Sequence, residues 1–329
     1  MDHVERYLEV FDELRRRKRW STGDTMLRFA ALTLAANDVA DRNADLEATA
    51  KILEKQAGAF SPLASAMRHA VAALLIRRGV DPSLTVSRIK ETLAVFKRLK
   101  LSRSGPHPTL AALLLVLHNG GEPPDDMTVE KMKAILARWN KDHFFLTGVD
   151  DYPMAAMHAT RELSVEEIGV QAEEIYQQLR KARFSSGEQL QLVSHLLMFS
   201  DVGGREAARR FAEVARLLRA AKQRVWQSHY DEVALLVLTG VHPAEVVPRV
   251  LEYRDRLRAR KPRPAAEIAF SIAAGIVLAE EADKAAALAE AATAANLRAV
   301  QAVIEAQQAA AIACMAACTT VVTTSAASS

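Results

Sequence analysis

A pattern of paired helices recurs along the whole chain and constrains its fold more than any other feature. Each copy has a loop of small and polar residues, a short apolar helix, a turn containing Gly, Pro or Asp, and a longer amphipathic helix. The copies begin near residues 22, 61, 104, 147, 185, 228 and 264, so neighbouring copies lie 36 to 43 residues apart. Self-similarity at this period is typical of repeated helical hairpins.

The spacing of apolar residues within each copy indicates helices and shows no alternating strand pattern. The shorter helices are apolar nearly all round, as in 110–117, so we expect them to lie between neighbouring helices. Ser164, with Glu167 three positions later, has the spacing of a capping box at a helix start. The longer helices carry apolar stripes, for example Val129, Met132, Ile135, Leu136 and Trp139.

The sequence therefore predicts an all-α fold, an array of about seven antiparallel helical hairpins. Such an array either winds into a right-handed superhelix like an α-solenoid or curls towards a partly closed α/α toroid, and the pattern leaves both open. We expect a single helical-repeat domain over 1–329. It would have an N-terminal cap and first hairpin at 1–60, central hairpins at 61–261, and an Ala-rich C-terminal hairpin and tail at 262–329.

Composition limits the class of protein further. Half of the 329 residues are hydrophobic, a quarter are charged, and the net charge of +3 gives no general case for nucleic acid as a partner. The first residues lack the apolar core of a signal peptide, and the uncharged segment after Glu305 is too rich in Ala, Thr and Ser to predict a membrane span. We expect a cytoplasmic bacterial protein in which Cys314 and Cys318 are small buried residues.

The loop at 147–153 is the part of the sequence whose side chains could most readily bind a ligand or take part in a reaction. Asp150 and Asp151 are adjacent carboxylates that would suit a divalent cation or acid–base chemistry, and Tyr152 follows them directly. The simpler interpretation is that one aspartate caps the next helix, with Pro153 in its first turn. Thr147 and Gly148 open the loop, and we include them among the candidate ligand-binding or partner-binding residues.

His195 completes the candidate set, although it lies in an apolar helix and suits a core or interface position. Its neighbour Ser194 points about a hundred degrees away on a helix, so the two cannot form a nucleophile–base pair. His143 and His158 flank the loop, but the spacing matches no established zinc signature. We therefore predict no catalytic residue, no metal site and no cofactor.

Basic residues gather at the ends of the longer helices, where cations complement the helix dipole. The same clusters would suit an anionic partner, but base stacking needs exposed aromatic residues, and only Trp20 and Trp226 lie near such clusters.

Three segments resemble one bacterial family: 144–152 (FFLTGVDDY), 190–197 (LQLVSHLL) and the Ala-rich run around 307–312. The family is known only as the domain of unknown function number four thousand and three, and the resemblance spans most of the chain. It implies a helical bacterial protein and carries no activity or site residue with it. We expect a non-enzymatic scaffold that binds a protein or peptide, and the alternative is an enzyme or small-ligand or metal-binding protein with its site at Asp150 and Asp151.

Overall fold

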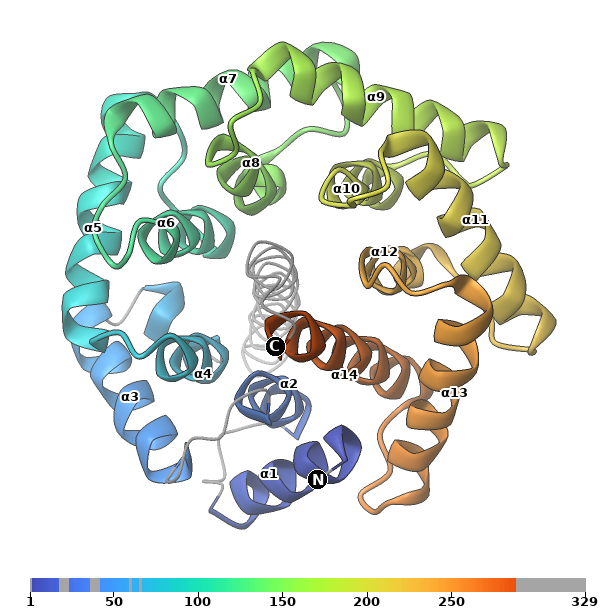
Figure 1. The fold of residues 1–329 in the computed structure, drawn as a ribbon. Coiled ribbons are helices and arrows are strands. Elements are labelled where there is room, and N and C mark those ends of the chain that lie inside the picture. Colours follow the sequence, from blue (N-terminus) through green and yellow to red (C-terminus); the bar gives the residue numbers. More distant parts are fainter. Residues whose placement is uncertain (1, 18–23, 36–41, 59–60, 65–66, 288–329) are drawn as a thin grey trace, which may run out of the picture. The chain divides into compact units, whose positions relative to one another are not determined.

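The computed structural model describes residues 2–17, 24–35, 42–58, 61–64 and 67–287 (Figure 1). These ranges contain fourteen α-helices, three short 3-10 helices and no strand, so the all-α prediction is confirmed for them. None of the described helices is both long enough and apolar enough to cross a membrane. The predictions for Trp20, Cys314, Cys318 and the C-terminal tail fall outside the described residues.

The described residues form two compact units, and each unit combines segments that are distant in sequence. The first unit contains 2–8, 134–148 and the described part of 162–302, and the second contains the described parts of 9–133 together with 149–161. Two helices, α1 (His3–Arg17) and α7 (Asp126–Asp142), contribute residues to both units.

The first unit has two layers of helices (Figure 1). Three helices of seventeen residues pack side by side: α9 (Val165–Lys181), α11 (Gly204–Ala220) and α13 (Pro243–Ala259). The other layer contains α10 (Glu188–Leu197), α12 (Tyr230–Leu238) and α14 (Ala266–Ala287), and each of these packs on the long helix that precedes it. The 3-10 helix η3 (Gln227–His229) leads into α12.

The second unit is built from the same two kinds of helix. The longer ones are α3 (Arg42–Ala57) and α5 (Pro82–Arg98), which pack together. The shorter ones are α2 (Asp24–Ala35), α4 (Arg68–Arg78), α6 (Pro106–His118) and α8 (Tyr152–Ala159), with the 3-10 helices η1 (Pro62–Ala64) and η2 (Val149–Asp151). Residues 108–116 of α6 are buried on every side because α6 packs against both α5 and α8.

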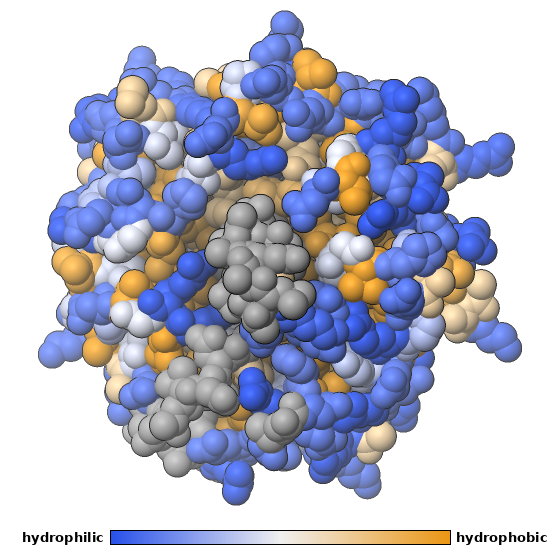
Figure 2. Space-filling view, viewed as in Figure 1, coloured by the Kyte–Doolittle hydropathy of each residue, from blue (hydrophilic) through white to orange (hydrophobic). Residues whose placement is uncertain are grey.

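Burial follows the predicted apolar stripes. The stripe of α7, from Val129 to Trp139, is buried, and so is the stripe of α9 formed by Ile168, Ala172, Ile175, Tyr176 and Leu179. The surface drawn in Figure 2 is mainly hydrophilic, and apolar residues are interspersed among the charged and polar ones. Ser164 and Glu167 form the predicted capping box at the start of α9.

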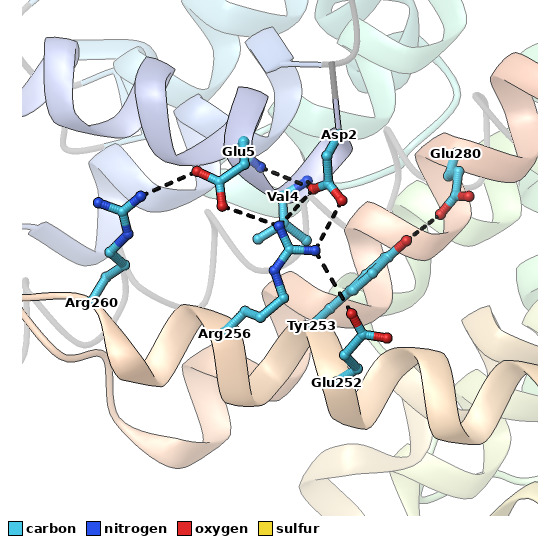
Figure 3. A network of polar contacts seen from close by, with 8 residues as sticks. All are labelled: Asp2, Val4, Glu5, Glu252, Tyr253, Arg256, Arg260 and Glu280. Atoms are coloured by element: carbon cyan, nitrogen blue, oxygen red, sulfur yellow. Dashed lines mark hydrogen bonds and ion pairs between the residues drawn. The ribbon is translucent and has the colours of Figure 1, made fainter.

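Charged residues attach the start of α1 to α13 in the first unit (Figure 3). The Arg256 guanidinium donates to both Asp2 carboxylate oxygens at 2.9 Å and to Glu5 at 3.1 Å, and Arg260 also donates to Glu5. Hydrogen bonds from Arg256 hold the pKa of Asp2 below its usual range. Beside them the Tyr253 hydroxyl donates to Glu280 at 2.8 Å, which joins α13 to α14.

Candidate partner-binding site

The loop that follows α7 presents two exposed phenylalanines. The side chains of Phe144 and Phe145 are 68% and 91% exposed, and their rings meet edge to face with centroids 5.1 Å apart. No other two consecutive large apolar residues of the described ranges are both exposed. We call residues 143–148 the FF loop.

Backbone hydrogen bonds give the FF loop a defined shape. The His143 N–H donates to the Trp139 carbonyl and continues the helical pattern for one residue beyond α7. The His143 carbonyl then accepts from the Leu146 N–H at 2.9 Å and from the Thr147 N–H at 3.2 Å. The chain therefore turns tightly around Phe144 and Phe145, and both rings project from the turn.

The first end of the FF loop is fixed to α9 through His143. The His143 Nε2 lies 2.8 Å from a Glu173 carboxylate oxygen, and the other Glu173 oxygen accepts from Gln177 at 2.7 Å. The imidazole also packs on the buried Tyr176 ring, with centroids 4.4 Å apart. A hydrogen bond and an aromatic contact thus position the residue directly before the two phenylalanines.

The second end of the FF loop is fixed to α10 through Thr147. The amide nitrogen of Gln191, a residue only 1% exposed, donates to the Thr147 hydroxyl at 3.0 Å. One turn further along α10, the His195 ring stacks on the Trp139 indole with centroids 3.6 Å apart and an interplanar angle of 12°. His195 therefore lies in the core beneath the loop, whereas Gly148, which follows Thr147 in the chain, is exposed.

Ser194 does not pair with His195. Its hydroxyl donates to the Gln191 carbonyl at 2.7 Å, within its own helix. The Gln191 side chain, and not Ser194, makes the hydrogen bond to the FF loop.

Asp150, Asp151 and Tyr152 belong to the second unit and are integrated into its helices. Asp150 is exposed in η2, whereas Asp151 is 8% exposed at the N-cap position of α8. The interpretation that one of the two aspartates caps this helix is wrong for Asp151, because its carboxylate makes no capping hydrogen bond. The turn of η2 brings the backbone into α8 with Pro153 in the first turn, as predicted.

Tyr152 joins α8 to the connection between α5 and α6. Its hydroxyl oxygen accepts the Ser102 N–H at 3.0 Å, and its ring packs edge-on against Phe96 with centroids 6.3 Å apart. His107, at the start of α6, has its pKa lowered by burial, and the negative charge of Asp150 partly offsets that effect. The contacts of Tyr152 are those of a packing residue.

The histidines near the predicted loop do not assemble a metal site. His143 pairs with Glu173, and His158 is buried in α8 with its Nδ1 3.3 Å from the Arg161 guanidinium. In the described part of the chain, no three side chains of His, Cys, Asp or Glu lie together as metal ligands would.

Sequence reasoning missed Phe144 and Phe145 as candidates, and it also missed their supports Glu173, Tyr176 and Gln191. The two phenylalanines had a readable signal. They follow Trp139, the last residue of the α7 stripe, at positions that do not continue its helical spacing. The buried face of α7 therefore does not explain why these two positions are apolar. The supporting residues gave no such signal because they lie 30 to 44 residues further along the chain.

Comparison with known proteins identifies the family. Residues 10–309 match the family described as protein of unknown function (DUF4003), and the chain belongs to that family. It is also similar to the uncharacterized protein YeaA of Bacillus subtilis (strain 168), with 24% identity over 95% of this chain and 93% of that protein. No solved structure matches the chain significantly.

Proposed function

We propose that this protein is a non-enzymatic helical-repeat scaffold that binds a protein or peptide partner through the FF loop. The observation that carries the proposal is the exposure of Phe144 and Phe145 on a backbone fixed at both ends. Exposed aromatic residues on an ordered surface are typical of the anchors that dominate protein interfaces.

The energetics favour a partner that offers an apolar pocket. Full burial of one Phe side chain contributes about 1.5–3 kcal/mol. The turn around His143 and the bonds from Glu173 and Gln191 already order the loop, so binding has to order few additional groups. Two adjacent rings on a fixed loop therefore favour association more than the same rings on a flexible segment.

The pairing of long and short helices supports the repeat arrangement that this function needs. Contacts between α9 and α10, α11 and α12, and α13 and α14 in the first unit suit consecutive antiparallel hairpins. The same holds for α3 with α4 and α5 with α6 in the second unit. An open superhelix and a partly closed toroid remain the two forms of the proposal, and both present loops between hairpins to a partner.

Site-specific photo-crosslinking in cells of the source organism tests the proposal. A photoreactive phenylalanine analogue replaces Phe145 in one variant and Val170, a 52% exposed residue of α9, in the control variant. We expect a discrete crosslinked protein with the probe at 145 and no such product with the probe at 170. Absence of a product at 145, or the same products at both positions, would count against a partner-binding FF loop.

The alternative function is a small-ligand or metal site at Asp150 and Asp151. The observation that favours it is the buried Asp151 carboxylate, which does not serve as a helix cap. A ligand well above its dissociation constant stabilises a protein by about 2–4 kcal/mol. A melting-temperature screen should then find a stabilising compound whose effect disappears in Asp150→Asn and Asp151→Asn, and a screen without any shift would remove this alternative.

A further inference from the structure

The end of α11 and the segment after it form a cationic surface with an exposed tryptophan. We define the Trp226 patch as Arg216, Arg219, Lys222, Arg224 and Trp226. All five side chains are exposed, and no Asp or Glu occurs between Glu213 and Asp231. The patch lies entirely within the first unit.

The cations of the Trp226 patch are not neutralised by neighbouring carboxylates, unlike those at the start of the same helix. Arg205 pairs with Glu174, and Arg209 and Arg210 both pair with Glu206. These bonds lower the pKa of Glu206 to about 2. None of the four patch cations has an ion pair within the described residues. The second half of α11 and the segment directly after it therefore carry a positive charge that no carboxylate compensates.

The patch also presents an aromatic face. Trp226 is 56% exposed, and the Arg224 guanidinium lies 5.7 Å from its ring centroid. The Trp226 backbone is fixed, because its N–H donates to Nδ1 of the buried His229 at 3.2 Å. On the other side of the patch, Arg219 lies over the Phe184 ring at 5.6 Å.

Complementation of the helix dipole explains only part of this arrangement. Cations in the last turn of α11 offset the partial negative charge of its C-terminus. That effect does not require Arg224 and Trp226, which lie beyond the helix, and it gives no reason to expose an indole to water. An additional function of the patch accounts for both features.

We propose that the Trp226 patch binds single-stranded nucleic acid, with phosphates against the four cations and a base stacked on Trp226. One polymer supplies both the anions and the planar rings that the patch can bind. An acidic peptide would match the cations but would leave the indole without a stacking partner. The net charge of +3 does not oppose this inference, since the charge of the patch is local.

Fluorescence anisotropy of a labelled twelve-residue oligothymidylate, titrated with the full chain, tests the inference. Neutralising four phosphates on a single strand predicts a slope of about −3 for log K against log salt concentration. Trp226→Ala should weaken binding about 5- to 150-fold, which corresponds to the stacking contribution of one base. Replacing Arg216, Arg219, Lys222 and Arg224 with Gln should abolish binding and the salt dependence together.

A charge-matched control separates the patch from general electrostatics. The double variant Glu174→Gln and Arg205→Gln removes one ion pair, between α9 and the start of α11, without changing the net charge, and its affinity should equal that of the unmodified chain. A glutamate peptide of equal charge should bind more weakly than the oligonucleotide. The inference is overturned if this peptide binds as tightly, if Trp226→Ala has no effect, or if neither ligand binds. Crosslinking at position 145 does not depend on this outcome.

Discussion

Replacing Tyr152 with Phe tests whether this predicted site residue supports the fold. The change removes the hydroxyl oxygen that accepts the Ser102 N–H at 3.0 Å and keeps the ring against Phe96. A fully buried amide left without a partner costs about 1–3 kcal/mol. Because Ser102 is only partly buried, water replaces part of the lost bond, and we expect a loss of about 1 kcal/mol. In a chain of this size that loss lowers the Tm by about 1–2 °C.

Thermal unfolding followed by circular dichroism measures this loss, and hydrogen exchange at the Ser102 amide gives the local readout. Exchange at this amide should accelerate in Tyr152→Phe. Tyr176→Phe is the matched control: Tyr176 is also a buried tyrosine, and its hydroxyl makes no hydrogen bond to any described residue. The reasoning is refuted if Tyr152→Phe leaves both stability and Ser102 exchange unchanged while it weakens the binding of a ligand or partner.

Two further substitutions probe the core of the first unit. Burial raises the pKa of Glu232 above its ordinary value of 4.5, because the protein interior disfavours the charged carboxylate. The folded state is therefore most stable relative to the unfolded state below pH 4.5, where Glu232 is protonated in both states. It loses stability as the pH rises, because the unfolded state releases this proton more readily. Glu232→Gln should therefore stabilise the protein increasingly from pH 4 to 8 in urea unfolding, whereas the exposed Glu188→Gln should not, and a pH-independent difference would contradict this account. Gly204→Ala should lower the urea midpoint, because the new Cβ would lie 2.8 Å from Ile175 Cγ1. This overpacking costs about 1–3 kcal/mol, against a helix-propensity gain of up to about 1 kcal/mol, and an unchanged midpoint would show that Ile175 moves aside.

The features that could be predicted from sequence are those encoded within one helical turn. The stripes of α7 and α9 repeat every three or four residues, and all the residues named in them are buried. The capping box of Ser164 and Glu167 has both of its hydrogen bonds. The apolar neighbours of His195 predict a core or interface position, and its side chain is 1% exposed.

The features that escaped prediction depend on contacts between distant residues. The Tyr152 hydroxyl accepts a hydrogen bond from the Ser102 N–H, which lies 50 positions earlier in the chain, and no local sequence pattern reveals such a partner. The side chain of Asp151 has the identity of a capping residue, yet the η2 turn leads the backbone into α8 in a conformation that makes no cap bond. Segments 2–8 and 134–148 join the first unit through similarly distant contacts, such as that of Arg256 with Asp2.

The affinity of the crosslinked partner for single-residue variants is the most direct test of the proposed function. The partner captured at position 145 is purified and titrated against the unmodified chain, Phe145→Ala and Val170→Ala. Burial of the Phe145 side chain contributes about 1.5–3 kcal/mol, so Phe145→Ala should raise the Kd about 10- to 150-fold. Val170→Ala should leave it unchanged within about twofold, because a single exposed aliphatic residue outside the FF loop takes no part in the contact. Equal Kd values for the unmodified chain and Phe145→Ala would contradict a partner-binding FF loop.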